Sequence, residues 1–292
     1  MMKNKRVLDA RDVIKLRSLA NDIRKHWGVF SDVPVGNDLI KLLEDKENII
    51  ICEYPFETTS ESHTDATITI FETNYGKLTF IGLNSSIYMD EQIFALAHEL
   101  YHYLTKTGKA YHLDDDVEDE WDEAKADRFA AELLLPIDAL ISKVEKYFPN
   151  GSINDAPYLR LLRFIAVLQG EWWIPFRSVV MRLREEKFIT SEQYEQLMEI
   201  DCRDLKGDYS KIFENFDPTA HKILNYKSKK IRISRDAINA TISNYEDGDI
   251  SYEELVKTLE LFNMHPSDFG YTVTVELDDD MSFLFKEDDD EG

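Results

Sequence analysis

Two histidines and a glutamate in one short segment could together hold a metal ion and activate water. The segment His98-Glu99-Leu100-Tyr101-His102 has the H-E-x-x-H pattern. Residues four apart share one face of an α-helix, so both imidazoles can bind one zinc ion. Glu99 then lies where its carboxylate can deprotonate a zinc-bound water, which is the chemistry of peptide-bond hydrolysis. The alternative is a helix whose two histidines bind no metal.

The surrounding residues predict a largely buried helix. Asp90 is the predicted N-cap, and apolar side chains such as Leu96 and Leu100 recur at helical spacing. The helix is expected to end between Thr105 and Gly108. Because buried histidines need polar partners and one metal ion satisfies both, this context favours a metal site.

A catalytic zinc ion has three protein ligands and one open position, so a third ligand must come from elsewhere. The metzincin pattern requires glycine at position 105 and histidine at position 108. The chain has Thr105 and Gly108 there. This pattern is therefore excluded, and a carboxylate outside the helix becomes the expected third ligand.

The next predicted helix, residues 123–136, supplies carboxylates one turn apart. Glu123 and Asp127 share a face of this helix. Glu123 is the predicted third ligand, with Glu120 or Asp119 as alternatives, since any carboxylate of this acidic region could also be a solvated surface charge. Asp127 is predicted to accept a hydrogen bond from the outer nitrogen of a ligating histidine.

Together the two motifs resemble the ImmA/IrrE family of zinc metallopeptidases. The likeness rests on H-E-L-x-H at 98–102 and on E-x-x-A-[ND]-x-F-A-A-x-L-L-x-P at 123–136. Weaker similarity at 77–84 and 175–189 extends it over roughly residues 8–200. The resemblance implies that zinc is the cofactor and that Glu99 is the general base. The implied zinc ligands are His98, His102 and Glu123.

The resemblance also implies a substrate class, because members of that family act on helix-turn-helix repressors with basic surfaces. The chain has a net charge of −23, so it is not expected to bind nucleic acid directly. An acidic run is predicted to steer a basic repressor or antitoxin-like regulator toward the zinc. This run comprises Asp114, Asp115, Asp116, Glu118, Asp119, Glu120, Asp122 and Glu123.

A second donor to the oxyanion of the reaction is expected near the metal. The sequence offers His112, Tyr103, Tyr111 and Tyr88 for this role, and nothing in their spacing ranks one above another. Each could equally be a structural residue.

The fold class predicted is α+β, mainly helical, with a small mixed or antiparallel sheet beside the zincin-type helix and a helical C-terminal extension. Segments 49–54, 66–71 and 78–83 are rich in β-formers, and the last two are predicted to form a hairpin. Strand 78–83 or its neighbour is expected to align an extended peptide by strand addition.

Three regions are predicted along the chain. Residues 1–200 form a zinc metallopeptidase domain with a helical tail, 201–233 a linker, and 234–292 a small C-terminal unit with an acidic tail. Segment 158–200 could be a helix-turn-helix DNA reader, but packing against the catalytic domain is preferred given the acidic charge.

The predicted location is the cytoplasm. The sequence has no apolar stretch long enough for a membrane span and no signal peptide, and Cys52 and Cys202 are expected to be reduced. The favoured function is a zinc endopeptidase in a stress-response, mobile-element or toxin–antitoxin-like regulatory pair. The alternatives are a non-catalytic binding protein with a zinc scaffold and an acidic DNA mimic.

Overall fold

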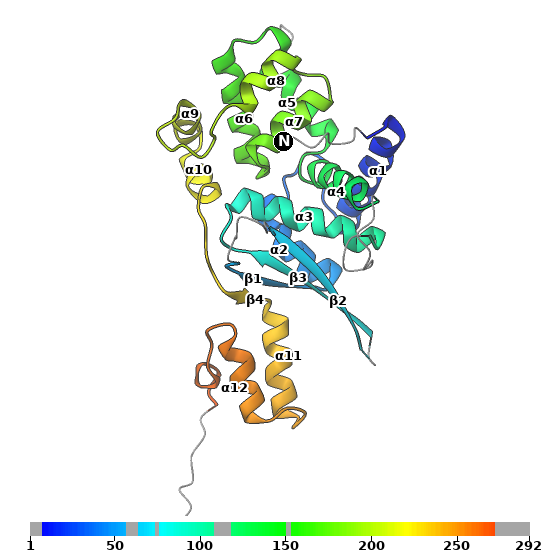
Figure 1. The fold of residues 1–292 in the computed structure, drawn as a ribbon, viewed down its shortest axis with the longest axis vertical. Helices are drawn as coiled ribbons and strands as arrows, with labels where there is room; N and C mark the ends of the chain where they lie inside the picture. The colour runs from blue at the N-terminus through cyan, green and yellow to red at the C-terminus, as the bar shows by residue number, and fades with distance from the viewer. Residues whose placement is uncertain (1–7, 57–63, 74–75, 108–117, 150–152, 272–292) are drawn as a thin grey trace, which may run out of the picture. The chain divides into compact units, whose positions relative to one another are not determined.

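The computed structural model describes residues 8–56, 64–73, 76–107, 118–149 and 153–271. Within these residues, twelve α-helices accompany one four-stranded sheet (Figure 1). The chain divides into two compact units, Met1–Ser234 and Arg235–Gly292. The predicted α+β class, mainly helical with a small sheet and further helices toward the C-terminus, is confirmed.

The sheet is mixed, with strand order β2-β3-β1-β4. Its strands are β1 (Ile49–Tyr54), β2 (Ala66–Thr73), β3 (Gly76–Asn84) and β4 (Arg232–Ile233). β2 and β3 form the predicted antiparallel hairpin, β1 runs parallel to β3, and β4 pairs antiparallel with β1. β2 is therefore an edge strand, whereas β3 lies between two neighbours.

One face of the sheet packs against helices. Alternate residues of β1 and β3 are buried, among them Ile51 and Ile81, and they share a core with Leu96 and Leu100. This alternation follows from the period of two in a strand. The helices of this core are α1 (Ala10–Trp27), α2 (Leu39–Glu47), α3 (Met89–Thr105) and α4 (Glu118–Leu134).

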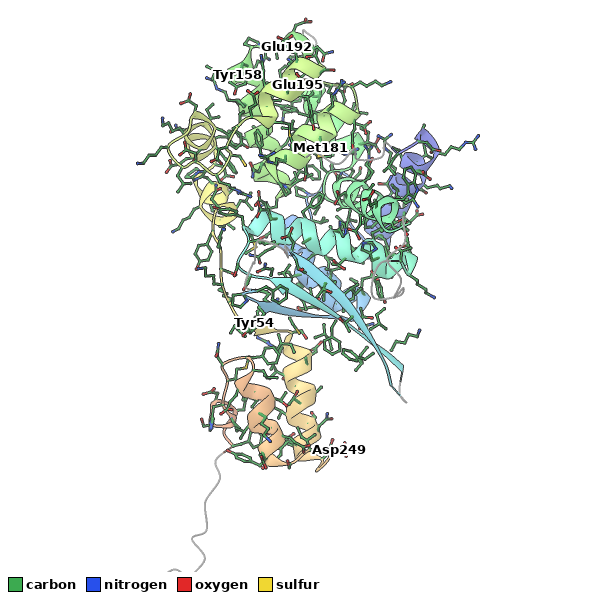
Figure 2. The ribbon with its side chains drawn as sticks, in the orientation of Figure 1. Tyr54, Tyr158, Met181, Glu192, Glu195 and Asp249 are labelled. Atoms are coloured by element: carbon green, nitrogen blue, oxygen red, sulfur yellow. The ribbon has the colours of Figure 1, made fainter. Side chains whose placement is uncertain are left out.

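A second core is built from helices alone. Buried side chains such as Phe164, Trp172 and Val180 hold it together. Its helices are α5 (Ile137–Tyr147), α6 (Tyr158–Trp172), α7 (Phe176–Glu185), α8 (Ser191–Met198), α9 (Asp208–Phe216) and α10 (Pro218–Leu224). Figure 2 shows Glu192 and Glu195 of α8 at the end of these helices that lies away from the sheet.

The structure differs from the linker predicted over residues 201–233. α9 and α10 lie within this segment and pack on α6, with Tyr209 and Phe213 buried. Gly207 and Pro218 mark helix starts: Gly207 is the N-cap of α9 and Pro218 is the first residue of α10. The segment therefore belongs to the first unit.

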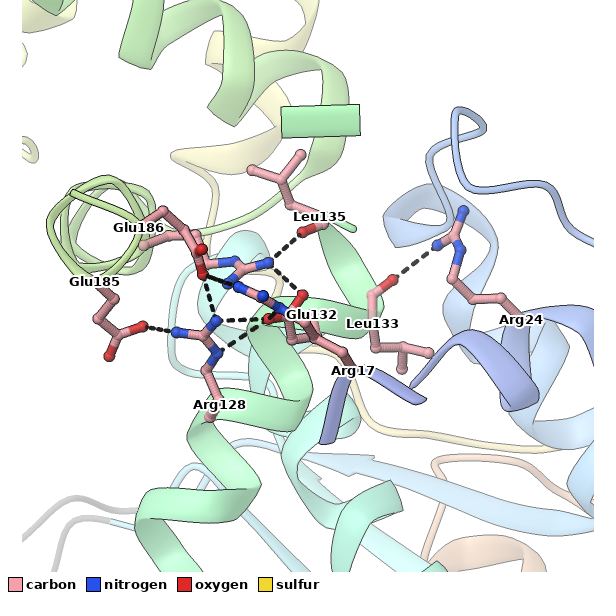
Figure 3. A network of polar contacts seen from close by, with 9 residues as sticks. Arg17, Arg24, Arg128, Glu132, Leu133, Leu135, Glu185 and Glu186 are labelled. Carbon is pink, nitrogen blue, oxygen red and sulfur yellow. Dashed lines mark hydrogen bonds and ion pairs between the residues drawn. The ribbon is translucent and has the colours of Figure 1, made fainter. Parts of the chain in front are cut away.

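A buried network of three arginines and three glutamates ties α1, α4 and α7 together (Figure 3). At its centre Glu132 of α4 accepts hydrogen bonds from Arg17, Arg128 and Arg182. Glu185 and Glu186 complete it by pairing with Arg128. Since each buried charge has partners, the network fixes how α4 lies against α7.

The second unit contains a helical hairpin. Its helices are α11 (Arg235–Glu246) and α12 (Tyr252–Glu260). Ser251 and Glu254 form the predicted capping box at the start of α12. The β-like runs and acidic tail predicted beyond Tyr271 lie outside the described residues.

Candidate metal centre

α3 carries both histidines of the H-E-x-x-H pattern. The helix begins at Met89 with Tyr88 as N-cap, so the prediction of Asp90 as N-cap is wrong. Asp90 lies instead in the first turn, fully buried, with Arg203 at 2.6 Å. A charge pair across the fold, which no local pattern shows, keeps this side chain from capping. α3 ends at Thr105, within the predicted limits.

Three side-chain atoms converge beside α3 (His98, His102, Glu123). Nε2 of His98 lies 3.1 Å from Nε2 of His102 and 3.1 Å from Glu123 Oε2. Nε2 of His102 lies 3.4 Å from Glu123 Oε1. Two ligands bound at about 2.0–2.1 Å to one tetrahedral zinc lie about 3.3 Å apart. The two Nε2 atoms and the carboxylate of Glu123 are therefore separated by distances close to those between ligands of one zinc ion.

The outer nitrogen of His98 is held by Asp127. Oδ1 of Asp127 lies 3.1 Å from Nδ1 of His98. Asp127 lies one turn after Glu123 on α4, so the same helix face supplies both the carboxylate beside Nε2 and the acceptor for Nδ1. This is the arrangement predicted from the spacing of the two carboxylates.

The outer nitrogen of His102 is held by a relay of two hydroxyls. Nδ1 of His102 lies 3.1 Å from Oγ1 of Thr107, which lies 2.8 Å from Oγ1 of Thr105. Thr105 donates its proton to the carbonyl oxygen of Tyr101. Thr107 must therefore donate to Thr105 and accept from His102. In a neutral imidazole this leaves Nε2 of His102 with a free electron pair for a metal.

The charges at the site are strongly coupled. Burial lowers the pKa of His98, but hydrogen bonds and charges of Asp127 and Glu123 outweigh it and raise this pKa to about 10. Hydrogen bonds from His102 and His98 hold the pKa of Glu123 far below its ordinary value. Both shifts favour a positive charge on His98 beside the negative charge of Glu123.

Glu99 stands beside this group. Burial raises the pKa of its carboxyl group, although the charges of His98 and His102 oppose the rise. Its carboxylate also accepts a backbone hydrogen bond from Ile68 of the edge strand β2. A general base for water near neutral pH needs a pKa shifted in this direction.

The site opens into a cleft of about 720 Å³. The cleft is lined by His98, His102, Glu99, Glu123 and Asp127, so the predicted ligands and the predicted base share one cavity. Its other walls come from residues 64–68 at the start of β2 and from the beginning of α7.

Two of the predicted oxyanion donors, Tyr103 and Tyr88, do not line this cleft within the described chain. Tyr88 instead lies between two cations, with Arg203 4.0 Å and Lys227 4.4 Å from its ring centre. His112 and Tyr111 lie outside the described residues.

Glu120 and Asp119 are the predicted alternatives to Glu123 as the third ligand. Among the described residues, Glu120 is not a member of the cluster of donor atoms. The side chain of Asp119 lies outside the described residues, as do those of Asp114, Asp115, Asp116 and Glu118.

Three residues of the site were not predicted: Thr107, Arg177 and Ser178. Arg177 and Ser178 line the cleft from α7, far along the chain from the histidines. Thr107 follows the end of α3. The only sequence signal for Arg177 and Ser178 was their place in the segment that resembles the family's C-terminal helix, and Thr107 had none.

A helix with two histidines facing a helix-borne glutamate beside a small mixed sheet forms a candidate metal site. Residues 44–152 match the family model described as Peptidase_M78: IrrE N-terminal-like domain. The chain therefore carries a domain of the ImmA/IrrE metallopeptidase family over these residues, and the resemblance seen in the two motifs is confirmed. The family implies a metallopeptidase that acts on protein, and the His98, His102 and Glu123 group is consistent with it.

The chain was also compared with solved structures and with curated proteins. A solved structure described as a Mycobacterium tuberculosis transcriptional regulator is similar with a TM-score of 0.36 and 18% identity. The similarity covers 59% of this chain and 48% of that one, so it spans about half of that protein. No curated protein matches the chain. Within the described residues, no helix combines the length and apolarity needed to span a membrane.

Proposed function

We propose that the chain is a zinc-dependent endopeptidase of the cytoplasm. The observation that carries the proposal is the group of two Nε2 atoms and one carboxylate. The Nε2 atoms of His98 and His102 are 3.1 Å apart, and they lie 3.1 Å from Oε2 and 3.4 Å from Oε1 of Glu123, respectively. The dimensions of this group and its donor set of two histidines and one glutamate are those of catalytic zinc. Glu99 in the same cleft supplies the base that a purely structural zinc site does not need.

The side chains have separate tasks in this reaction. His98, His102 and Glu123 would hold zinc, which when bound polarises a scissile carbonyl and acidifies water. Glu99 takes the proton of the attacking water on its carboxylate and passes it to the leaving amine. Asp127 and Thr107 keep both imidazoles in the orientation and tautomer that leave Nε2 free.

The edge strand supports the placement of an extended peptide. Asn84 donates to the carbonyl of Asp65, so the odd-numbered residues of β2 exchange hydrogen bonds with β3. The backbone groups of Ala66, Ile68 and Ile70 therefore point to the free edge. A peptide adding to this edge competes with Glu99 for the N–H of Ile68 and so releases the carboxylate for catalysis.

The proposed substrate is a basic helix-turn-helix repressor or antitoxin-like regulator. The net charge of −23 supports attraction of a basic partner. Glu91, Glu99, Glu123 and Asp127 add negative charge at the cleft itself. Such steering weakens as salt screens it, so the cleavage rate should fall between low and physiological ionic strength. A rate indifferent to salt would count against the steering.

The test is incubation of the zinc-loaded protein with the regulator encoded by the neighbouring gene, followed by intact-mass measurement. Two fragments of the regulator should appear. No fragments should appear when a chelator is added or when the Glu99→Gln variant replaces the parent protein. Glu99→Gln should still bind one zinc ion, because Glu99 is not a ligand. An intact regulator in the presence of zinc-loaded protein would refute the activity.

The same variant separates cleavage from sequestration. A binding protein with a zinc scaffold needs His98, His102 and Glu123 but not Glu99. If Glu99→Gln keeps full biological function, sequestration is correct and the peptidase proposal is wrong. An acidic DNA mimic would additionally lose its function when the acidic tail is removed.

A further inference from the structure

Arg177 is a cation of the cleft that the reaction described above does not use. It is the second residue of α7, its side chain is exposed, and it lines the same cleft as His98 and Glu99. Within the described chain it makes no hydrogen bond or ion pair. The buried Arg128 and Arg182 of the same unit are, by contrast, held by carboxylates.

The position of Arg177 along the cleft follows from its neighbours. On α3 the cleft lining runs from His98 back to Glu91. These residues are seven apart, which is about 10 Å along the helix. Phe176, the residue before Arg177, packs its ring 4.6 Å from that of Tyr209. Tyr209 donates to Gln169, which donates to Asp90 in the first turn of α3. The start of α7 therefore lies near Glu91, at the end of the cleft away from the metal ligands.

The surroundings of Arg177 favour an anion. Within the described chain no side chain caps α7, so the N–H groups at its start can donate hydrogen bonds to an anionic partner. Ser178 adds a hydroxyl to the same wall. Glu91 does not neutralise Arg177, because Glu91 is already held by Arg203 at 3.1 Å.

The edge strand gives the direction of a peptide in the cleft. Ile68 lies at the metal end, since its backbone N–H bonds to Glu99. Thr64 lies at the other end, since its carbonyl accepts from Asn84, which precedes α3. β2 therefore runs toward the metal. A peptide paired antiparallel to it, the more stable pairing, runs from the metal toward Arg177 in the N-to-C direction.

We propose that Arg177 is a specificity residue that binds an acidic side chain of the substrate on the carboxyl side of the scissile bond. The rise of about 10 Å on α3 between His98 and Glu91 equals about three residues of extended peptide at about 3.3 Å each, so we expect that side chain about three residues beyond the bond. This inference rests on the proposed peptidase function, but the binding experiment below tests it without requiring cleavage. A carboxylate–guanidinium pair of about 1.5–3 kcal/mol gives about ten- to a hundredfold selectivity.

The first experiment compares cleavage profiles. A pool of synthetic peptides of mixed sequence is incubated with zinc-loaded protein, and the products are sequenced by mass spectrometry. Cleaved peptides should be enriched in Asp and Glu about three residues beyond the cut. Arg177→Glu should reverse this enrichment toward Lys and Arg, and Arg177→Lys should retain part of it. Arg163→Glu, which changes an exposed arginine of α6 outside the cleft lining, should leave the profile unchanged.

The second experiment measures binding without turnover. Glu99→Gln protein loaded with zinc is titrated with two peptides that differ only by Glu or Lys at that position. The Glu peptide should bind about ten- to a hundredfold more tightly, and Arg177→Glu in the same background should reverse the order. Equal binding of both peptides overturns the role of Arg177. If the Glu peptide binds more tightly but the parent protein with Glu99 intact cuts no peptide, the role of Arg177 is supported and the peptidase proposal is refuted.

Discussion

The hydroxyl oxygen of Thr107 lies 3.1 Å from Nδ1 of His102, and the relay through Thr105 to the carbonyl of Tyr101 makes it an acceptor. A residue just beyond the end of α3 thus sets the tautomer of a predicted ligand inside it. The tautomer matters because only an unprotonated Nε2 can bind zinc.

Thr107→Val should therefore weaken zinc binding, because it removes the acceptor and keeps the shape of the side chain. The loss expected for such an outer partner is about tenfold or more in affinity. Competition against a chromophoric chelator measures it. Thr107→Ser keeps the hydroxyl and should bind zinc like the parent; equal affinities for all three proteins would show that the relay has no such role.

Asp127→Asn should also weaken zinc binding, by about 10- to 100-fold. The amide is a weaker acceptor for Nδ1 of His98 and carries no charge to favour the cation. The matched control is Asp122→Asn on the same helix, whose carboxylate pairs with Lys125 at 3.0 Å. Equal zinc affinities of the two variants would contradict the assignment.

The stability of the zinc-free protein should fall in alkaline solution. The folded state raises the pKa of His98 to about 10, whereas an unfolded histidine titrates near about 6.5. Because the pKa of His98 is higher in the folded state, protonation of His98 stabilises the fold fully below about pH 6.5. This contribution disappears as the pH rises toward about 10. Thermal unfolding in chelator across this range measures the loss. His98→Asn should flatten this part of the profile, and an unchanged slope in that variant would exclude His98 as its source.

Local patterns in the sequence predicted the parts of the site that lie on single helices. His98 with His102, and Glu123 with Asp127, are each four residues apart, so helical geometry alone places each pair on one face. The edge position of β2 and the role of Asp90 depend on strand order and on a partner more than 100 residues away, at Arg203. No local spacing contains that information.

The first unit ends at Ser234 rather than at the predicted residue 200, for a related reason. Gly207 and Pro218 interrupt helices, and an interruption looks the same in a linker as in a packed pair of short helices. The apolar residues that distinguish the two, Tyr209 and Phe213, pack on α6, a helix about 40 residues upstream. Their burial becomes visible only in the folded chain.

Glu132→Gln should destabilise the fold strongly. The substitution removes the charge at the centre of the network of Arg17, Arg128 and Arg182 and leaves buried guanidinium groups short of a partner. Breaking a buried pair in this way costs about 3–5 kcal/mol. Denaturant titration measures the change. Lys25→Ala, which breaks the exposed pair with Asp22, should change stability by less than about 1 kcal/mol, and a similar loss in both variants would refute the role of the network.

The chain that ends at Ser234 should fold and bind zinc, whereas the chain that ends at Ile200 should not. The compact first unit extends to Ser234. Ending at Ile200 removes Arg203 and leaves the buried carboxylate of Asp90 without its cation, at a cost of about 3–5 kcal/mol. Loss of buried Phe213 adds about 3–5 kcal/mol more.

Together these losses approach the whole stability of a domain, about 5–15 kcal/mol. Circular dichroism and zinc titration of the two shortened chains distinguish the outcomes. Arg203→Ala in the full chain isolates the ion pair and should destabilise α3, which begins at the Asp90 end and carries His98. If the chain ending at Ile200 folds and binds zinc like the full chain, α9 and α10 are dispensable and the first unit ends earlier than the contacts on α6 indicate.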